Sequence, residues 1–305
     1  MDLTLLQSAL TKFQDGLEDA IKTKTYDTEV YENGQKAKEA AIRGQGLIGY
    51  VHEAVKESFD LELLKGEQEY RLYPALKKKN ELTITGFLKA KKQDVVILFG
   101  GSRPQPEPIA GGPLDGEMDS VGKAASQKAI VIGVRSQMSS VDKNFDTLME
   151  RTFAETLNLR LRLPDLVMGE VYLLPVYEYD PRAMLVQEVR FMPQHVKVEK
   201  FIRTFFGITD RRADAAIDED LYKYERSALV LADFRQHPPR LYLTRQELQQ
   251  DGLVSDKLQR EITSLSPEGF TTDLIAIHQR RHLDPAELTT DIEPDSVHPL
   301  ADDRA

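Results

Sequence analysis

The chain of 305 residues contains no cysteine. Disulfides, cysteine-ligated zinc and thiol nucleophiles are therefore excluded, and a catalytic metal must be held mainly by oxygen ligands. Such ligands favour Mg²⁺, with Mn²⁺ as the alternative. No apolar run approaches the roughly 18 residues that a membrane span requires, and Met1-Asp2-Leu3 lacks the basic start of a signal peptide. We expect a soluble, cytoplasmic protein that does not contact a membrane.

The formal net charge is −10, which disfavours nucleic-acid binding because phosphate contacts depend on Lys and Arg. The charge is unevenly distributed, however. Residues 77–162 hold 14 Lys and Arg against 10 Asp and Glu, whereas residues 211–305 hold 12 against 19. The basic excess permits a nucleic-acid site in the first region, although clusters of lysine also occur simply as solvated surface.

Hydrophobic periodicity and turn residues predict an α/β protein with a mixed sheet flanked by helices. Helices are expected over residues 3–24, 50–59, 142–161 and 196–206, after the capping box Thr244-x-x-Glu247, and from about Ser266-Pro267. Strands are expected over residues 82–88, 94–99, 129–135, 167–176, 227–234 and 240–243. The order from residue 50 to residue 176 is then helix, strand, strand, strand, helix, strand.

Composition divides the chain into four segments. Residues 1–43 form an N-terminal helical segment, 44–210 an α/β core, 211–282 a C-terminal α/β extension with small strands and helices, and 283–305 an acidic tail expected to be disordered. Within the core, strands 82–88 and 94–99 are most simply a hairpin joined by the basic link Lys89-Ala90-Lys91-Lys92. Residues 100–128 are too long and too rich in proline and glycine for an ordinary connection.

Two strands carry the residues that indicate chemistry. Strand 94–99 begins with one acid, Asp94, in an otherwise apolar run, and strand 129–135 ends on Arg135-Ser136-Gln137. Open α/β sheets tend to place their chemistry at such strand ends. An acid on one strand and a cation on a neighbouring one predict a metal-dependent phosphodiester site.

These features resemble restriction endonucleases of the PD-(D/E)xK superfamily, especially members whose second motif reads E-x-K-S-Q. The resemblance covers roughly residues 44–180 and rests on the element order, on Asp94, and on Gly133-Val134-Arg135-Ser136-Gln137 with the following helix that begins near Lys143-Asn144. It implies a restriction-endonuclease-like core in which Asp94 binds Mg²⁺. It also implies that Arg135 stands where the family has a lysine that positions or activates water.

The second acid of the family motif is missing, because Gly133 occupies its position. Either another acid has replaced it or the site is inactive. Two candidates remain open: Glu53 on the glycine-opened helix, which matches a helix-borne glutamate of many members, and Glu155, which lies at the flank of the apolar stripe of helix 142–161. Each could instead be an ordinary solvated or paired glutamate. A further alternative is an acid of the 115–119 loop.

Arginine does not give up its proton, so Arg135 could position water or clamp a phosphate but could not act as the base. It could also pair structurally with Asp94 or Glu155. Gln137 completes the candidate catalytic set of Asp94, Arg135, Glu53 and Glu155, of which the three acids are the candidate metal ligands. DNA contacts are predicted for Lys89, Lys91, Lys92, Arg103, Lys123, Lys128, Ser136, Lys143 and Asn144.

The sequence thus predicts a Mg²⁺-dependent endonuclease for double-stranded DNA, of the restriction or phage-defence kind. We expect a homodimer, because cutting both strands takes two sites. Two alternatives remain: a catalytically inactive protein of the same fold that binds nucleic acid or serves as a scaffold, which the loss of the second acid favours, and a metal-dependent phosphoesterase for nucleotides or RNA.

Overall fold

A mixed six-stranded sheet forms the centre of the protein. The computed structural model describes residues 1–66, 69–100, 102–212, 214, 216 and 218–282. The strand order is β14-β13-β10-β9-β6-β3, with bounds β3 (Tyr70–Tyr73), β6 (Val95–Phe99), β9 (Ile130–Ser136), β10 (Val167–Pro175), β13 (Arg226–Asp233) and β14 (Arg240–Tyr242). Strands β9, β10 and β13 are parallel. The outer strands β3, β6 and β14 are antiparallel to their neighbours, so the predicted mixed sheet is confirmed.

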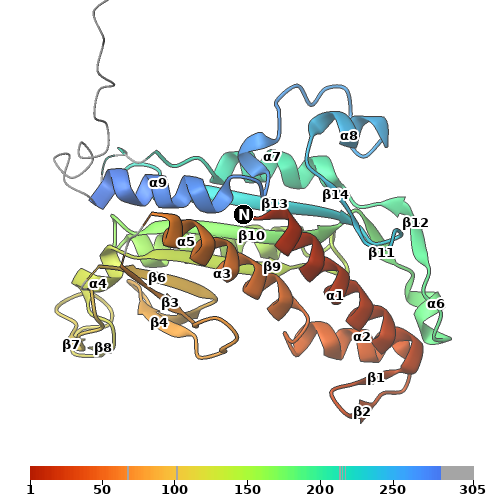
Figure 1. Ribbon diagram of the computed structural model, residues 1–305, viewed down its shortest axis with the longest axis horizontal. Helices are drawn as coiled ribbons and strands as arrows, with labels where there is room; N and C mark the ends of the chain where they lie inside the picture. Colours follow the sequence, from red (N-terminus) through yellow and green to blue (C-terminus); the bar gives the residue numbers. More distant parts are fainter. Residues whose placement is uncertain (67–68, 101, 213, 215, 217, 283–305) are drawn as a thin grey trace, which may run out of the picture.

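Helices cover both faces of this sheet. On one face lie α1 (Leu3–Thr23), α2 (Gly34–Arg43), α3 (Ile48–Lys65) and α9 (Phe270–His282). The other face is covered by α5 (Phe145–Arg160), α7 (Val198–Ile208), η1 (Thr263–Leu265), α8 (Arg245–Gln250) and the short α4 (Lys123–Gln127). In Figure 1, α1 and α3 cross in front of the central strands. The α/β class predicted from the sequence is therefore confirmed.

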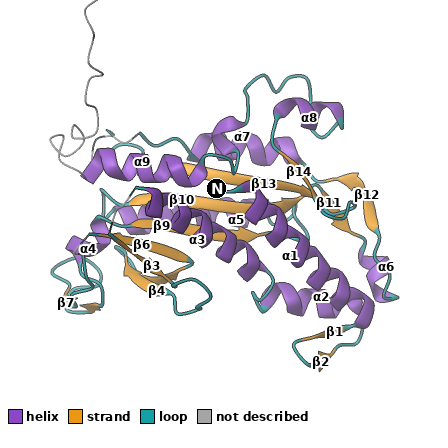
Figure 2. Cartoon of the chain, in the orientation of Figure 1, coloured by secondary structure: helices purple, strands orange, loops and turns teal. Residues whose placement is uncertain are grey.

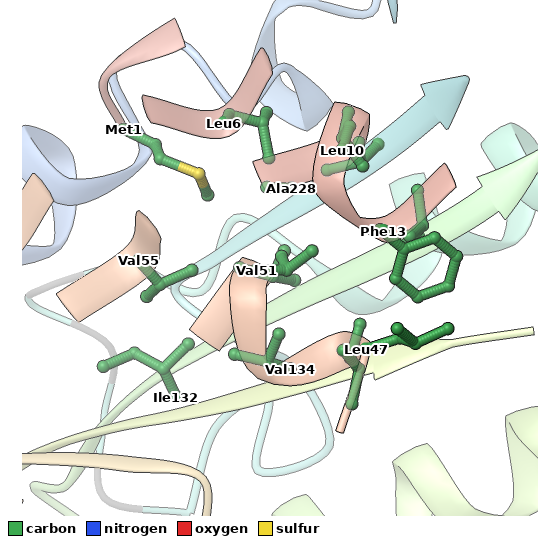
Figure 3. Close-up of a cluster of buried hydrophobic side chains, with 14 of the residues drawn as sticks. Met1, Leu6, Leu10, Phe13, Leu47, Val51, Val55, Ile132, Val134 and Ala228 are labelled. Atoms are coloured by element: carbon green, nitrogen blue, oxygen red, sulfur yellow. The ribbon is translucent and has the colours of Figure 1, made fainter. Parts of the chain in front are cut away.

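The first face shows why these sequences form helices and strands. The apolar side chains of α1 recur every three or four residues, and Leu6, Leu10 and Phe13 are completely or almost completely buried. In Figure 3, Val51 and Val55 of α3 lie between α1 and the strand β9. One hydrophobic cluster joins side chains from residues 1–43, 44–210 and 211–282, so these three segments share a core.

Smaller ribbons lie outside the central sheet. They are β1 (Thr25–Tyr26) with β2 (Glu29–Val30), β4 (Leu82–Thr85) with β5 (Ala90–Gln93), β7 (Glu107–Pro108) with β8 (Met118–Asp119), and β11 (Tyr177–Tyr179) with β12 (Phe191–His195). The helix α6 (Pro181–Leu185) connects β11 and β12. Figure 2 shows the ribbons β1–β2 and β7 at the periphery of the fold.

The predicted hairpin of residues 82–88 with 94–99 is wrong. Strand β4 pairs with β5, which is the segment expected to be the basic link, while β6 joins the central sheet between β3 and β9. Asp94 is therefore not a strand residue but lies in the bend between β5 and β6. The predicted helix-strand-strand-strand-helix-strand order counted residues 82–88 as its first strand, but in the central sheet that place belongs to β3, which was not predicted.

The remaining predictions concern the ends of the chain. The capping box at Thr244 and Glu247 is confirmed at the start of α8. Residues 283–305, for which disorder was expected, lie outside the described residues. Across the part of the chain that the structure describes, none of the helices has the length and apolar character needed to cross a bilayer.

Candidate functional site

The register between strands shows which residues of β6, β9 and β10 lie next to one another. Gly133 of β9 is paired with Glu170 of β10, and Val95 at the start of β6 is paired with Ile132. Because Ile132 and Val134 point into the core under α1 and α3, the alternation along the strand sends Gly133 and Arg135 to the opposite face, beneath α5. This face holds the candidate site.

Asp94 lies at the edge of this face, where β6 begins. Its Oδ2 accepts a hydrogen bond from the backbone N–H of Val134 at 2.7 Å, which ties the bend to the end of β9. The carboxylate is only partly buried and lines a cavity. The structure thus brings Asp94 next to the strand that carries Arg135, as the sequence predicted, although from a bend and not from within a strand.

A carboxylate from the next strand, that of Glu170, lies against Gly133. A Cβ built on Gly133 would collide with Oε2 of Glu170 and would lie 3.2 Å from its Cδ. Glycine is therefore required at residue 133 for Glu170 to take its observed position. Glu170 lies on β10, one of the two neighbours of β9, and Asp94 lies in the bend directly before β6, the other neighbour. Glu170 was not among the acids predicted from the sequence, which were Asp94, Glu53, Glu155 and the acids of the 115–119 loop.

Arg135 connects two carboxylates. Its Nη1 lies 3.3 Å from Oε1 of Glu170, and its Nη2 donates to Oε2 of Glu155 from α5. Lys91 of β5 donates to the other oxygen of Glu155. Glu155 therefore does reach the sheet, as its place on the helix predicted. Arg135 and Lys91 thus contact the two oxygens of Glu155, while within the described residues Glu170 has only Arg135 as an ion-pair partner.

Glu170 is strongly perturbed. Its side chain is completely buried, and neither carboxylate oxygen has a hydrogen-bond partner in the described residues. Burial raises the pKa of Glu170 to about 7. The positive charge of Arg135 acts to lower this pKa, but the negative charges of Glu155 and Asp94 oppose that effect. Glu170 is therefore a carboxyl group that can hold or release a proton near neutral pH.

Glu155 and Arg135, unlike Glu170, remain charged at neutral pH. Burial alone would raise the pKa of Glu155, but the charges of Arg135 and Lys91 hold that pKa below its ordinary value. Burial likewise opposes the charge on Arg135, yet Glu170 and the other nearby acids raise the pKa of the guanidinium above its ordinary value. The guanidinium is thus a permanent cation with two acidic partners.

A cavity of about 710 Å³ opens onto Asp94, Arg135 and Glu155, whereas the completely buried Glu170 lies behind Arg135 and does not line it. It is lined by more cations than acids: Lys89, Lys91, Arg135 and Arg151 against Asp94 and Glu155. The predicted residues Ser136, Gln137 and Asn144 also line it, although Gln137 uses its amide to bond the backbone carbonyl of Ser139. The surplus of positive charge suits a phosphate-bearing ligand.

Other predicted site residues lie elsewhere. The carboxylate of Glu53 pairs with Lys56 and accepts the backbone N–H of Lys77, so the structure does not bring it to Asp94. The remaining predicted DNA contacts, all exposed residues that do not line the cavity, are Lys92, Arg103, Lys123, Lys128 and Lys143. Of the predicted DNA contacts, the cavity is therefore lined by Lys89, Lys91, Ser136 and Asn144 and not by the other five.

The donor set can be tested against the implied Mg²⁺. No group of three or more His, Asp or Glu side chains that could hold a metal ion occurs within the described residues. Magnesium in proteins is commonly held by one or two carboxylates together with water. Asp94 and Glu170 supply oxygen ligands of this type, and the Glu170 oxygens, which accept no hydrogen bond in the described residues, fit such a role although Arg135 pairs with one of them. The chemistry of the residues therefore fits Mg²⁺.

Comparison of the chain with models of protein families, with curated proteins and with solved structures found no match. The interpretation of the site therefore depends on its own geometry.

Proposed function

We propose that the protein is a Mg²⁺-dependent endonuclease for double-stranded DNA with a restriction-endonuclease-like core. The observation that carries the proposal is the position of Glu170, which places a carboxylate against Gly133. The motif that resembles the PD-(D/E)xK superfamily lacks only this acid and its lysine. Asp94 and Glu170 then form an acidic pair on either side of β9. With the smaller elements β4, β5, β7, β8 and α4 left out, α3, β3, β6, β9, α5 and β10 have the helix-strand-strand-strand-helix-strand order that the resemblance implies.

In this proposal Asp94 and Glu170 would hold the metal ion. Bound Mg²⁺ would neutralise charge on the scissile phosphate and lower the pKa of a bound water. Arg135 would present its fork of N–H groups to the phosphate, and Glu155 would fix the orientation of that fork through its ion pair. Lys89, which lines the same cavity, would attract the DNA backbone.

The test is cleavage of supercoiled plasmid DNA by the purified protein in the presence of Mg²⁺ or Mn²⁺. Asp94→Asn and Glu170→Gln should each lower the rate by at least about 100-fold, the lower scale of losses when catalytic electrostatics are removed. Glu150→Gln changes an exposed glutamate on α5 and serves as the matched control. Full cleavage by both site variants would overturn the proposal. A homodimer in the cytoplasm is part of the same proposal, since cutting both strands takes two sites.

A second candidate function is a catalytically inactive protein of the same fold that binds nucleic acid or serves as a scaffold. The observation that favours it is the ion pairing of Arg135 with both Glu155 and Glu170, because a protein cation already balances these acids. Titration calorimetry with Mg²⁺ separates the candidates. DNA binding without metal binding or cleavage would support the inactive protein.

A further inference from the structure

The hairpin β4–β5 has an apolar tip that is held away from the core. Phe87 and Leu88 occupy the turn between the two strands, and 37% and 61% of their surfaces are exposed. Exposing large apolar side chains to water is unfavourable in free energy. Two of them in succession at a turn, where polar residues would serve as well, are therefore uncommon. The tip lies beside the cavity, because Lys89, the next residue, lines it.

Asn158 of α5 fixes the conformation of this tip. Its Oδ1 accepts the backbone N–H groups of Leu88 at 2.8 Å and Lys89 at 3.2 Å, and its Nδ2 donates to the carbonyl of Lys89 at 3.1 Å. The backbone carbonyl of Asn158 accepts the N–H of Phe87 at 2.6 Å. Gly86 permits this close approach, since a Cβ there would lie 2.5 Å from that carbonyl oxygen. The two apolar side chains are therefore displayed by a rigid support.

The charge of the hairpin is entirely positive. Residues 82–93 contain Lys89, Lys91 and Lys92 and no acid, in a chain whose net charge is −10. Lys92 is exposed, while Lys91 contacts Glu155 at the candidate site. An apolar tip with cations along one strand is complementary to a nucleic-acid groove, in which phosphates flank the stacked bases. The cores of protein interfaces are instead depleted of lysine.

We propose that the β4–β5 hairpin enters a groove of duplex DNA and inserts Phe87 and Leu88 as a wedge at a base step. Lys89 and Lys92 contact the flanking phosphates. Insertion of this kind unstacks the step and bends the duplex. This inference rests on the proposed function, because it takes DNA as the substrate. It adds that the DNA is deformed on binding and that the hairpin, which leads directly into Asp94, aligns the bent backbone with the cavity.

The experiment measures binding to a short duplex that carries 2-aminopurine at a central step, in EDTA so that cleavage does not interfere. The wild-type protein should raise the 2-aminopurine fluorescence as the base unstacks. Phe87→Ala with Leu88→Ala should abolish that rise and weaken binding by about 10-fold or more, without changing the dependence of affinity on salt. Lys92→Ala should instead reduce the salt slope by about one while keeping the fluorescence rise.

The matched control is Leu185→Ala with Val186→Ala, an exposed apolar pair at the end of α6. It should bind and unstack DNA as the wild type does. If the tip variant behaves like this control while Asp94→Asn abolishes cleavage, the wedge is overturned and the nuclease stands. If the wild type unstacks DNA through this tip but cleaves nothing with Mg²⁺ or Mn²⁺, the wedge stands and the nuclease fails. Absence of DNA binding at low salt overturns both.

Discussion

Two glutamates with completely buried side chains, Glu170 on β10 and Glu225 directly before β13, have opposite surroundings. Glu170 has a single charged partner and two carboxylate oxygens without hydrogen bonds in the described residues. Glu225 is saturated with donors: Arg160 at 2.6 Å, the backbone N–H of Met168 at 2.7 Å, Arg281 at 2.8 Å and Arg211 at 3.3 Å. The two carboxylates are therefore equally buried but differ greatly in the number of donors and cations that stabilise their negative charge.

The pKa values follow this difference. Burial tends to raise the pKa of both acids. At Glu225 the charges of Arg160 and Arg281, with the hydrogen bonds from Arg160 and Met168, bring the pKa below its ordinary value. At Glu170 the pKa stays raised, at about 7. We infer that Glu225 is a structural acid, and that Glu170 is left uncompensated because a ligand or proton completes its surroundings.

The largest expected effect is a difference in the free energy of unfolding between variants of Glu225 and of Glu170. Glu225→Gln should lower the free energy of unfolding by about 3–5 kcal/mol, because it leaves a group of buried arginines without their counter-charge. Glu170→Gln should cause no loss at pH 7–8, since it removes a carboxyl group whose ionised form is poorly compensated. Urea denaturation of both variants measures the difference. Comparable losses in the two variants would contradict the assignment of different roles.

The pH dependence of stability gives the next effect. The pKa of Glu170 is about 7 in the folded protein, above the ordinary value of 4.5. Between these values the folded state binds one proton more than the unfolded state, so stability is full below about pH 4.5 and falls as the pH rises to about 7. The loss is on the order of 3 kcal/mol. Glu170→Gln should lack this fall when unfolding is followed from pH 4.5 to 8, and an equal fall in the variant would exclude Glu170 as its source.

The sequence was sufficient to find the central strands β9 and β10 but not the register between them. The apolar runs that became β9 and β10 were predicted almost to the residue. Glu170 was visible as the lone acid of an apolar strand, which is the same signal that selected Asp94. Its relation to Gly133 depends on the register between two strands, however, and no local pattern specifies that register.

The mispaired hairpin has a different physical cause. Strand β5 has no apolar face, because it reads Ala90-Lys91-Lys92-Gln93 and is mostly exposed. Hydrophobic periodicity does not detect such a strand. Gly86 was the one local signal of the turn, since glycine often marks turns. The structure requires glycine at this position because Asn158 lies too close for a side chain. Strand β3 escaped prediction because its four residues are all only partly buried.

A third prediction tests the steric relation between Gly133 and Glu170. Gly133→Ala should lower the stability by about 1–3 kcal/mol, since its Cβ would collide with Oε2 of Glu170 in a closely packed interior. In a Glu170→Ala background the same substitution should cost much less, which a double-mutant cycle measures as a coupling energy. Additive losses would mean that the two residues do not interact. The exchange Gly133→Glu with Glu170→Gly should recover cleavage relative to Glu170→Gly alone.

The smallest effect concerns the outer ion pair of the site. Lys91 is 41% exposed and contacts Glu155, which keeps Arg135 as a second partner. Lys91→Ala should therefore change the stability by less than about 1 kcal/mol, and added salt should reduce even that difference, because exposed ion pairs are screened by water and ions. Under the proposed function the same variant should weaken DNA binding and reduce its salt slope by about one. Thermal unfolding and binding at two salt concentrations measure both quantities. A large loss of stability with unchanged DNA binding would show that Lys91 has a structural role, as the charges around Glu225 do. Lys91 would then not be one of the cations that attract the phosphate backbone.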